Sequence, residues 1–349
     1  MSIASTDRTT LAMTVPAGPP LPLTFASGLY DRMQALYTGE VKPAGIDLKF
    51  IVNDNPRDIF NRTSARQEFD VAEMSCSDYI ARLSVQKDTT PFIALPVYPA
   101  RCFRHGYITV NQRAGIRTAK DLEGKRIGLP RYTMTASVWI RGILQHEYGV
   151  DLSTIQWVEG QINDNGQHGE PGVMSLLRDV PITVNTSGKS LSELIDEGAI
   201  DAIIGTGVPD SRRHNLDVVR LFPNFRELEK EYFRRTRHFP IMHCIVIRRS
   251  LYEEHPFVAE SLYRAFCESK RIGIKHMRYI AIPRYMLPWM HDDLDEIDAV
   301  FGGDPFPYGV EAGRHNFEAF MQYMVEHGIL ASPLPVDDLF ADVGNSGLT

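Results

Sequence analysis

The chain has 349 residues, and its shares of hydrophobic (43%) and charged (23%) residues are typical of soluble globular proteins rather than of disordered chains. No apolar run approaches the roughly 18 residues that a membrane-spanning helix needs, and the net charge of −7 argues against a general nucleic-acid-binding protein, which needs an excess of Lys and Arg. A length well above the roughly 150 residues of one domain predicts about two domains.

The first twenty residues have the composition of a polar tail. They carry Asp7, Arg8 and three prolines, and they lack the basic start and continuous apolar stretch of a secretory signal. We therefore expect a flexible tail over 1–20 and a cytoplasmic location. The cysteines agree with a reducing compartment, because they are far apart and lack the CxxC spacing of a disulfide framework or a zinc site. They are Cys76, Cys102, Cys244 and Cys267.

Strand-like and helix-like segments alternate through the first part of the chain. Alternation of this kind predicts a parallel sheet, in which the loops at the carboxyl ends of the strands bind ligands. Ser75, Cys76 and Ser77 end one of these strands. The expected elements are a strand over 21–26, a loop over 27–32 from which an amphipathic helix departs, a strand over 45–52, a helix over 56–66, a strand over 69–74 and a helix over 78–85.

The segment 95–108 (LPVYPARCFRHGYI) places Arg101, Arg104 and His105 between two strand-like runs. Two prolines within it exclude a helix, so the chain must cross this region in an extended form. We expect it to cross from one lobe to another, beside a cleft that binds a small anion.

The rest of the chain continues the alternation and ends in helices. Residues 131–135 precede a helix whose unpaired backbone N–H groups favour an anion, and we expect Thr133 or Thr135 to cap it. The strand over 239–247 is interpreted as the return crossing. The other expected elements are a short helix over 119–125, strands over 126–129, 155–158 and 199–204, helices ending near 148 and over 190–197, 256–278, 294–299 and 313–327, a loop over 160–180 and a basic stretch over 212–237.

Several short segments are distinctive in combination. They are Tyr30-Asp31-Arg32, VKPAGIDL at 41–48, EFDVAEMS at 68–75, DLEGKRIG at 121–128, DAII at 201–204, PIMH at 240–243, VIRR at 246–249, HPFVAESLY at 255–263 and GDPFPYG at 303–309. In this order they resemble the 4,5-dihydroxyphthalate decarboxylase family, and the similarity covers about residues 22–330. DLEGKRIG is general to solute-binding proteins, whereas EFDVAEMS and PIMH point more narrowly to this family.

The resemblance implies the α/β fold of type II periplasmic solute-binding proteins, which has two lobes, each a mixed sheet flanked by helices, and a ligand cleft between them. Together with the two crossings, it predicts a discontinuous lobe one that consists of 21–100 and 240–349. Lobe two then comprises 101–239. The sequence leaves the oligomeric state open between a monomer and a homo-oligomer.

The resemblance also implies a non-oxidative decarboxylase that acts on a dihydroxylated aromatic dicarboxylate in aromatic degradation. The expected reaction converts 4,5-dihydroxyphthalate to 3,4-dihydroxybenzoate (protocatechuate) and carbon dioxide. The alternative is the solute-binding protein of an ABC transporter for an aromatic or nitrogen-containing nutrient. A third hypothesis is an enzyme related to thiamine-pyrimidine synthesis, which would need a His-rich iron and cofactor site that the sequence lacks.

Arginines suit a substrate with two carboxylates, because a planar guanidinium matches a carboxylate with two parallel hydrogen bonds. Arg101, Arg104 and Arg131 are the main candidates, and for each the competing interpretation is a surface or interlobe salt bridge. Polar residues at the ends of expected strands and helices complete the predicted binding set. These are Tyr30, Arg32, Ser75, Tyr132, Thr133, Thr135 and Thr206.

Loss of a carboxylate as carbon dioxide requires an acid that protonates the ring carbon and holds its proton near pH 7. His105, His243 and Glu73 qualify by position as catalytic residues, and the sequence does not decide between them. A lone histidine near a strand end is more often structural. Glu73 lies at the end of an expected strand, where packing does not explain a carboxylate. The competing interpretation is that Glu73 forms an ion pair with an arginine.

We expect neither a metal nor a cofactor. The sequence contains no HxH or HExxH pattern. The densest group of possible ligands, His291-Asp292-Asp293, is more simply a helix cap. Ser187-Gly188-Lys189-Ser190 resembles the end of a phosphate-binding loop, but Thr183 stands where that motif needs its first glycine.

Overall fold

A computed structural model describes residues 16–166, 168, 176–279, 281 and 284–344. Most of the expected tail over 1–20 and part of the expected loop over 160–180 lie outside the described residues. Within these ranges, no helix is both long enough and apolar enough to cross a membrane.

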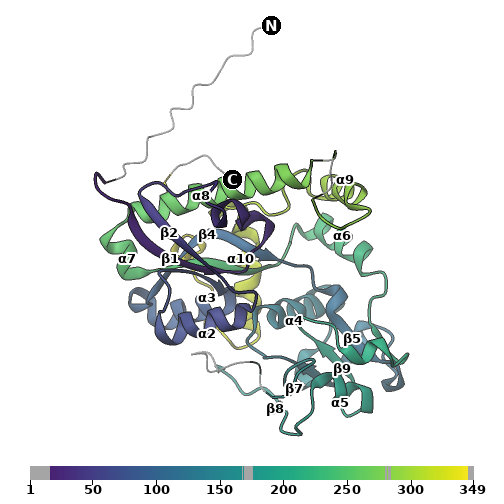
Figure 1. The fold of residues 1–349 in the computed structure, drawn as a ribbon. Coiled ribbons are helices and arrows are strands. Elements are labelled where there is room, and N and C mark those ends of the chain that lie inside the picture. Colours follow the sequence, from purple (N-terminus) through teal and green to yellow (C-terminus); the bar gives the residue numbers. More distant parts are fainter. Residues whose placement is uncertain (1–15, 167, 169–175, 280, 282–283, 345–349) are drawn as a thin grey trace.

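Two mixed sheets organise the molecule (Figure 1). The first has five strands in the order β2-β1-β3-β11-β4, and the second has six in the order β10-β5-β9-β6-β7-β8. Because helices flank both sheets, the predicted two-lobed α/β architecture is confirmed, whereas the lobe boundaries stay predictions. The strands are β1 (Leu21–Ser27), β2 (Ile46–Val52), β3 (Val71–Ser75), β4 (Phe92–Arg101), β5 (Ile108–Asn111), β6 (Arg126–Leu129), β7 (Gln156–Glu159), β8 (Ile182–Val184), β9 (Ala202–Ile204), β10 (Val218–Arg220) and β11 (Ile241–Arg248).

The first sheet brings together strand ends that are distant in the sequence. β1 runs parallel to β2 and to β3, as the alternation of strands and helices predicts. β11 lies between β3 and β4 and runs antiparallel to both. This pairing sets His243 opposite Ser75 and Ile245 opposite Glu73. The carboxyl-terminal end of β3 therefore meets the amino-terminal end of β11.

Helices cover both faces of the first sheet (Figure 1). α2 and α3 lie on one side of it, and α8 runs along the other. Most of the expected helices are found within a few residues of their predicted bounds. The helices are α1 (Gln34–Tyr37), α2 (Pro56–Arg66), α3 (Cys76–Gln86), α4 (Thr135–Tyr148), α5 (Leu191–Glu197), α6 (Phe225–Thr236), α7 (Arg249–Glu254), α8 (Phe257–Met277), α9 (Met290–Phe301) and α10 (Val310–Glu326).

β4 is longer than expected, and it contains both prolines of the crossing segment. Pro96 and Pro99 lie inside the strand. Proline lacks the backbone donor that a central strand needs, but β4 is the edge strand of its sheet, and its outer side carries an isolated bridge between Ala94 and Phe340. Its pairing with β11 also shifts register around His243. The carbonyl of Pro96 accepts a hydrogen bond from outside the sheet, from Gly309 N–H at 2.8 Å.

The start of α4 differs from the predicted cap. The residue before the helix is Met134, which makes no side-chain cap, so the expectation that Thr133 or Thr135 caps α4 is wrong. The hydroxyl of Thr135 instead accepts a hydrogen bond from the backbone N–H of Ser77 at 3.0 Å. The side chain that could have capped its own helix connects α4 to the start of α3.

The sequence does not predict α6, because its arginines indicate only a basic stretch. The helix is amphipathic: Tyr232 and Phe233 are buried, while most of its charged side chains are exposed. The short strands β8 and β10 escape prediction for another reason. Each has three residues and lies at an edge of the second sheet, so its hydrophobic pattern is too brief to read.

α4 packs against the hydrophobic cores of both sheets. Trp139 is fully buried, donates its Nε1–H to a β11 carbonyl at 3.1 Å and stacks on Phe320 of α10, with 5.4 Å between ring centroids. Ile140 belongs to the core of the second sheet. Packing against α10 is closest at Gly142, where a Cβ would lie 2.2 Å from Cδ2 of Tyr323.

We expect Gly142→Ala to destabilise the protein by roughly 1–3 kcal/mol, because the ring of Tyr323 must move to admit the methyl group. Helix propensity alone predicts the opposite sign, a gain of about 1 kcal/mol. Urea titrations measure the change in the free energy of unfolding. In a Tyr323→Leu background the loss should shrink or reverse, and an equal loss in both backgrounds would exclude the ring contact as its cause.

Candidate functional site

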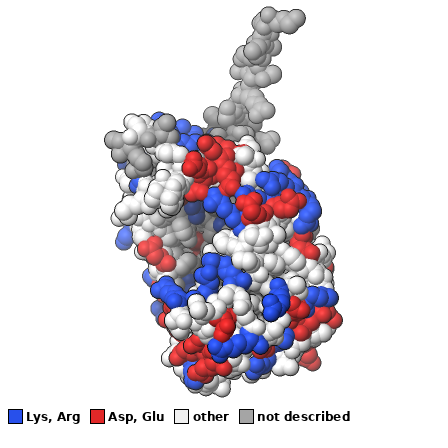
Figure 2. All heavy atoms as spheres, turned by 90° about the vertical axis from the view of Figure 1, so that its right-hand side faces the viewer, with Lys and Arg blue, Asp and Glu red and all other residues white. Residues whose placement is uncertain are grey.

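The surface is hollowed between the upper and lower parts of the molecule (Figure 2). On this face, Lys and Arg side chains are intermixed with Asp and Glu side chains. Two cavities formed by the described residues differ in the chemistry of their walls, and that difference decides which of them suits a small anion.

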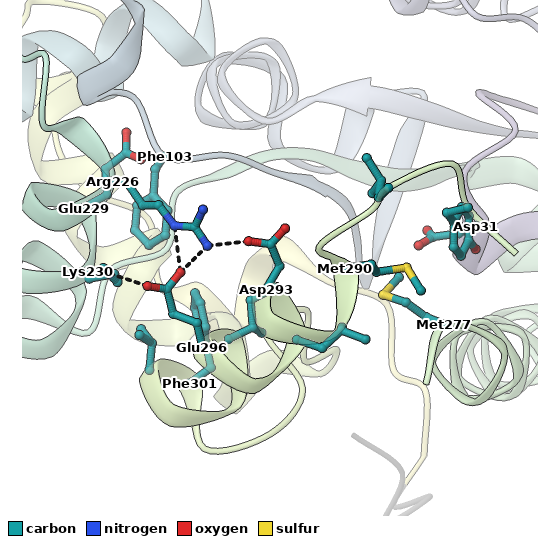
Figure 3. A pocket seen from close by; sticks show the side chains of 15 residues that line it. Asp31, Phe103, Arg226, Glu229, Lys230, Met277, Met290, Asp293, Glu296 and Phe301 are labelled. Atoms are coloured by element: carbon teal, nitrogen blue, oxygen red, sulfur yellow. Dashed lines mark hydrogen bonds and ion pairs between the residues drawn. The ribbon is translucent and has the colours of Figure 1, made fainter. Parts of the chain in front are cut away.

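One cavity, of about 480 Å³, lies between α6, α8 and α9. Its wall is mainly apolar, and its two cations pair with carboxylates of the same wall: Arg226 with Asp293 and Glu296, and Lys230 with Glu296 (Figure 3). Burial raises the pKa of Glu229, another wall residue, to about 7. Because its cations are already neutralised, this wall offers little to a dianion.

A second cavity, of about 740 Å³, is polar and lies between α2, the start of α3 and the loop before α4. Five arginines and three carboxylates line it, so its wall carries more positive than negative charge. Hydroxyl and amide groups add hydrogen-bonding atoms. The lining residues are Arg57, Asp58, Phe60, Asn61, Arg62, Ser64, Ala65, Arg66, Glu68, Ser75, Ser77, Asp78, Arg82, Arg131, Thr133 and Met134.

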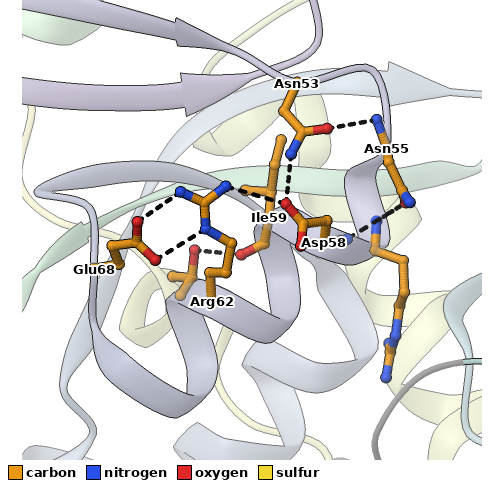
Figure 4. Close-up of polar contacts among 8 residues, drawn as sticks. Asn53, Asn55, Asp58, Ile59, Arg62 and Glu68 are labelled. Carbon is orange, nitrogen blue, oxygen red and sulfur yellow. Dashed lines mark hydrogen bonds and ion pairs between the residues drawn. The ribbon is translucent and has the colours of Figure 1, made fainter.

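The three carboxylates of this polar wall are engaged with two of its arginines. Arg62 contacts Glu68 at 2.6 Å and Asp58 at 3.1 Å (Figure 4). Arg82 contacts Asp78 at 3.1 Å. Two arginines of the wall are therefore held by carboxylates of the same wall.

Hydroxyl groups join the starts of α3 and α4 beside the polar cavity. Ser75 Oγ lies 2.9 Å from Thr135 Oγ1, and the backbone N–H of Ser77 donates to the same Thr135 oxygen at 3.0 Å. Both helices are long enough to carry partial positive charge at these ends. An anion in the cavity would meet hydroxyl donors and two helix amino termini.

Glu73, near the end of β3, is fully buried and contacts hydrogen-bonding groups from two separate segments, the end of β1 with the loop after it and the start of β11. Ser27 Oγ donates to it at 2.8 Å, and the backbone N–H of Gly28 donates at 3.4 Å. The hydroxyl of Tyr30 donates at 2.9 Å. Nδ1 of His243 lies 2.6 Å from Oε1 of Glu73. A buried carboxylate is costly unless it is hydrogen-bonded, and these groups meet that requirement.

These contacts keep Glu73 ionised. Burial alone would raise the pKa of Glu73, but the contacts with His243, Ser27 and Tyr30 outweigh burial and lower this pKa. Since an ionised carboxylate only accepts hydrogen bonds, Nδ1 of His243 carries the hydrogen of the short contact. Burial, and then the charge of Glu73, raises the pKa of Tyr30, which therefore remains a neutral donor near pH 7.

His243 lies beside the polar cavity. Its side chain is 20% exposed, whereas that of Glu73 is fully buried. Its ring meets that of Phe60, a lining residue, edge to face, with 5.0 Å between centroids. Ser75, its partner in the strand pairing, also lines the cavity. Because Nδ1 is engaged by Glu73, the other ring nitrogen is the one left to act on a ligand.

Three neighbours of this pair are absent from the predicted site residues. Ser27 ends β1 and Ser77 follows β3 in the first turn of α3, and a position just after a predicted strand is the signal that could have identified them. Phe60 lies within a helix and has no such signal. Gly28 is also needed, because a Cβ there would lie 2.9 Å from Cζ of Tyr30, which folds back over it toward Glu73.

The predicted residues around 131 divide between the cavity and the core. Arg131 and Thr133 line the polar cavity, and Arg131 donates to the carbonyl of His168 at 2.9 Å. Tyr132 is buried, and the guanidinium carbon of Arg141 lies 3.6 Å from the centroid of its ring. Tyr132 therefore belongs to the hydrophobic core of the second sheet. Thr206 is exposed after β9 and does not line the cavity.

Arg32 and Arg101 make structural contacts. The guanidinium of Arg32 lies 4.3 Å from the ring centroid of Tyr30 and also binds the Pro99 carbonyl, so it supports the Tyr30 side chain. Arg101 is buried and donates to the carbonyls of Phe239 and Pro307 at 3.3 and 3.1 Å. Burial lowers the pKa of Arg101 to about 10. Neither arginine lines the polar cavity.

The structure does not bring Arg104 and His105 to Glu73 and His243. His105 is 1% exposed, sits among aromatic rings and has its Nδ1 3.9 Å from Oε1 of Glu229. Burial lowers the pKa of His105 to about 4. Arg104 is buried with its guanidinium 5.1 Å from the centroid of the Tyr107 ring. The predicted roles of both residues stay predictions.

Among the described residues, no group of three or more His, Cys, Asp or Glu side chains is arranged to hold a metal ion. The described cysteines are free thiols. The pair of Glu73 and His243 is held by the hydroxyl groups of Ser27 and Tyr30.

Comparison with known proteins gives related sequences and a shared fold. No protein-family model matches the chain. It is 35% identical over 321 residues to 4,5-dihydroxyphthalate decarboxylase of Comamonas testosteroni, covering 92% of this chain and 96% of that protein. It is 38% identical over 189 residues to 4,5-dihydroxyphthalate decarboxylase of Pseudomonas putida, covering 54% and 72%. The aliphatic sulphonate-binding protein SsuA of Escherichia coli matches with a TM-score of 0.51 at 10% identity, covering 93% and 98%, which confirms the predicted periplasmic-binding-protein-like fold.

Glu73→Gln keeps the shape of the side chain and removes its charge. We expect it to lower the free energy of unfolding at pH 7 by about 1–3 kcal/mol, because hydrogen bonds to an ionised acceptor are lost. The folded-state pKa of Glu73 lies below its unfolded value of about 4.3, so the stabilisation is complete above that value and is lost as the pH falls through the folded-state pKa.

Denaturant titrations of both proteins at stepwise lower pH measure this difference. Glu68→Gln is the control, because Glu68 pairs with Arg62 at the surface and its loss should cost less. A difference between Glu73→Gln and the unmodified protein that stays constant down to strongly acidic pH would contradict an ionised Glu73.

Proposed function

The chain belongs to the 4,5-dihydroxyphthalate decarboxylase family, and we propose that it is a carboxy-lyase that converts 4,5-dihydroxyphthalate to 3,4-dihydroxybenzoate and carbon dioxide in aromatic degradation. The similarity to the Comamonas enzyme extends over 96% of that protein, which supports carrying its activity over as a whole. The single observation that carries the proposal is the 2.6 Å contact between Glu73 and Nδ1 of His243, beside a positively charged cavity.

The chemistry of the substrate defines what the site must supply. Each carboxylate of 4,5-dihydroxyphthalate is para to a hydroxyl group, so ionisation of that hydroxyl sends electron density to the carbon that bears the departing group. A proton is added to this carbon, the bond to the carboxylate breaks, and its electron pair restores the aromatic ring. The dianion takes up one proton and gives carbon dioxide and the monoanion of the product.

In this proposal, His243 is the acid that protonates the ring carbon. Glu73 fixes the imidazole through Nδ1, leaves Nε2 to carry the transferred proton, and stabilises the charged form of the ring. Ser27 and Tyr30 position Glu73 through their hydroxyl groups. The partial exposure of His243 gives it a route to regain a proton from water after each turnover.

The same proposal assigns binding to the polar wall. Arg131 and Thr133 meet a carboxylate, and Ser75 contributes its hydroxyl. The substrate then lies between lobe one, formed by 21–100 with 240–349, and lobe two, formed by 101–239. The four free thiols suit a reducing compartment, which supports a cytoplasmic location.

Incubation with 4,5-dihydroxyphthalate tests the proposed function directly. We expect carbon dioxide and 3,4-dihydroxybenzoate in equal amounts, measured by gas analysis and chromatography. In deuterated water, the product should carry one deuterium at the carbon that lost the carboxylate. Binding without turnover of this or any related dihydroxybenzene dicarboxylate would overturn the proposal and favour a solute-binding role.

Substitution of each candidate histidine in turn identifies the proton donor. We expect His243→Asn to lower kcat by about 10²–10⁴-fold, the usual contribution of a general acid, with substrate binding largely retained. His105→Asn should leave kcat per folded molecule near its original value, because His105 contacts neither Glu73 nor the polar cavity. Steady-state kinetics, corrected for the folded fraction by circular dichroism, measure both, and the reverse outcome would assign the role to His105.

A further inference from the structure

The two carboxylate oxygens of Glu73 differ in the groups that they contact. Oε1 lies 2.6 Å from Nδ1 of His243 and accepts a hydrogen bond from the Tyr30 hydroxyl at 2.9 Å. Oε2 accepts from Ser27 Oγ at 2.8 Å and from the backbone N–H of Gly28 at 3.4 Å, and it lies 3.2 Å from the Tyr30 hydroxyl. Among the described residues, Tyr30 therefore shares with His243 the oxygen that holds the imidazole.

The surroundings of Tyr30 hold its hydroxyl against this oxygen. Gly28 admits it, because a Cβ at that position would lie 3.1 Å from the hydroxyl oxygen. The guanidinium of Arg32 lies over the Tyr30 ring, 4.3 Å from its centroid. Burial, and then the charge of Glu73, raises the pKa of Tyr30, so the hydroxyl keeps its proton and donates it. The charges of Arg32 and Asp54 act on Tyr30 in opposite directions.

Two donors on one carboxylate oxygen compete for its negative charge. A hydrogen bond to an ionised carboxylate stabilises the charge and makes the oxygen a weaker acceptor for its other donor. The Tyr30 hydroxyl therefore weakens the attraction between Oε1 and the Nδ1–H of His243. Because that attraction stabilises the protonated ring, a weaker one lets the proton on Nε2 leave more readily.

We propose that Tyr30 is a positioning residue that limits how strongly Glu73 holds the imidazolium form of His243, and so makes His243 a stronger acid toward the ring of the substrate. The consequence for turnover rests on the proposed function. Glu73 orients the imidazole but also retains its proton, and Tyr30 keeps the first effect while it reduces the second. Tyr30 does not line the polar cavity, so it acts through Glu73 rather than on the substrate.

The other groups packed around the pair leave this role to Tyr30. The thiol of Cys76, at the start of α3, interacts with the charge of Glu73, but burial raises the pKa of Cys76 well above its usual range, so this thiol is neutral. Cys244, next to His243 in β11, is also buried. From α2, the ring that meets His243 is Phe60, which carries no charge. The charged side chains of the polar wall are the same in every variant compared below, so they affect all of them alike.

Proton NMR of the Nδ1–H of His243, assigned by its loss in His243→Asn, tests the competition without turnover. Tyr30→Phe keeps the aromatic ring and removes the hydroxyl. We expect it to move this resonance downfield, because the hydrogen bond to Oε1 becomes stronger. Ser27→Ala removes a donor from the other oxygen and should move the resonance less. Tyr79→Phe is the matched control, because the buried Tyr79 hydroxyl donates to the Leu339 carbonyl at 2.6 Å, and it should leave the resonance in place.

The pH profile of kcat tests the consequence for turnover. A proton that is held more strongly is transferred more slowly, and it is also lost to solvent only at higher pH. We therefore expect Tyr30→Phe to lower the maximal kcat about twofold to threefold and to move its alkaline limb up by about half to one pH unit. The two profiles then cross, and the variant is the faster enzyme above the limb. A folding defect or a misplaced ring cannot produce this crossing.

Gly28→Ala gives an independent test if Tyr30→Phe does not fold, because the added Cβ displaces the Tyr30 hydroxyl, and it should move the resonance in the same direction. A resonance that stays in place in Tyr30→Phe, or that moves equally in Ser27→Ala, would rule out the role of Tyr30. Profiles that fall in parallel without crossing would do the same. A shifted resonance in a protein without turnover refutes the proposed reaction alone, and normal turnover with an unmoved resonance refutes the role of Tyr30 alone.

Discussion

The burial of an ionised carboxylate at Glu73 is the constraint on which the rest of the site depends. A charge removed from water costs several kcal/mol unless donors surround it. The donors come from the loop after β1, which supplies Ser27 and Tyr30, and from β11, which supplies His243 from 170 positions away. The parallel pairing of β1 with β3 and the insertion of β11 beside β3 are both needed to bring them together. The fold and the buried charge therefore depend on each other.

Local sequence patterns account for one half of this arrangement and not for the other. The alternation of strands and helices predicts the parallel strands β1, β2 and β3, and it singles out Glu73 because a carboxylate there has no packing role. No local pattern indicates that β11 enters between β3 and β4 in the antiparallel direction. The sequence therefore names Glu73 and His243 as separate candidates and cannot predict their contact, which depends on long-range strand order.

Basic residues are harder to interpret from sequence. The residue type shows that the side chain is charged, but not which group in the fold it binds. Arg101 interrupts an apolar stretch and resembles an anion ligand, yet its guanidinium holds the carbonyls of Phe239 and Pro307 where β4 meets β11. Arg57 lies on an ordinary amphipathic helix, which gives it no distinguishing pattern, yet it lines the polar cavity. Only the tertiary arrangement separates an arginine that binds backbone carbonyls from one that lines a cavity.

A site that decarboxylates a dianion must attract negative charge while it keeps a carboxylate next to its acid. In the proposed mechanism, the pairing of Glu73 with His243 meets both needs, since the imidazolium form of the acid would cancel the charge of Glu73 and leave the positively charged wall to attract the substrate. By the same proposal, transfer of the proton from His243 to the ring leaves the charge of Glu73 unbalanced. The product monoanion then lies near an uncompensated carboxylate in a region of reduced dielectric, and repulsion favours its release. The proposed cycle closes when His243, whose side chain is partly exposed, takes up a proton from water and restores the neutral pair. A binding protein with the same fold has no need of such a pair, because the charge of its ligand does not change.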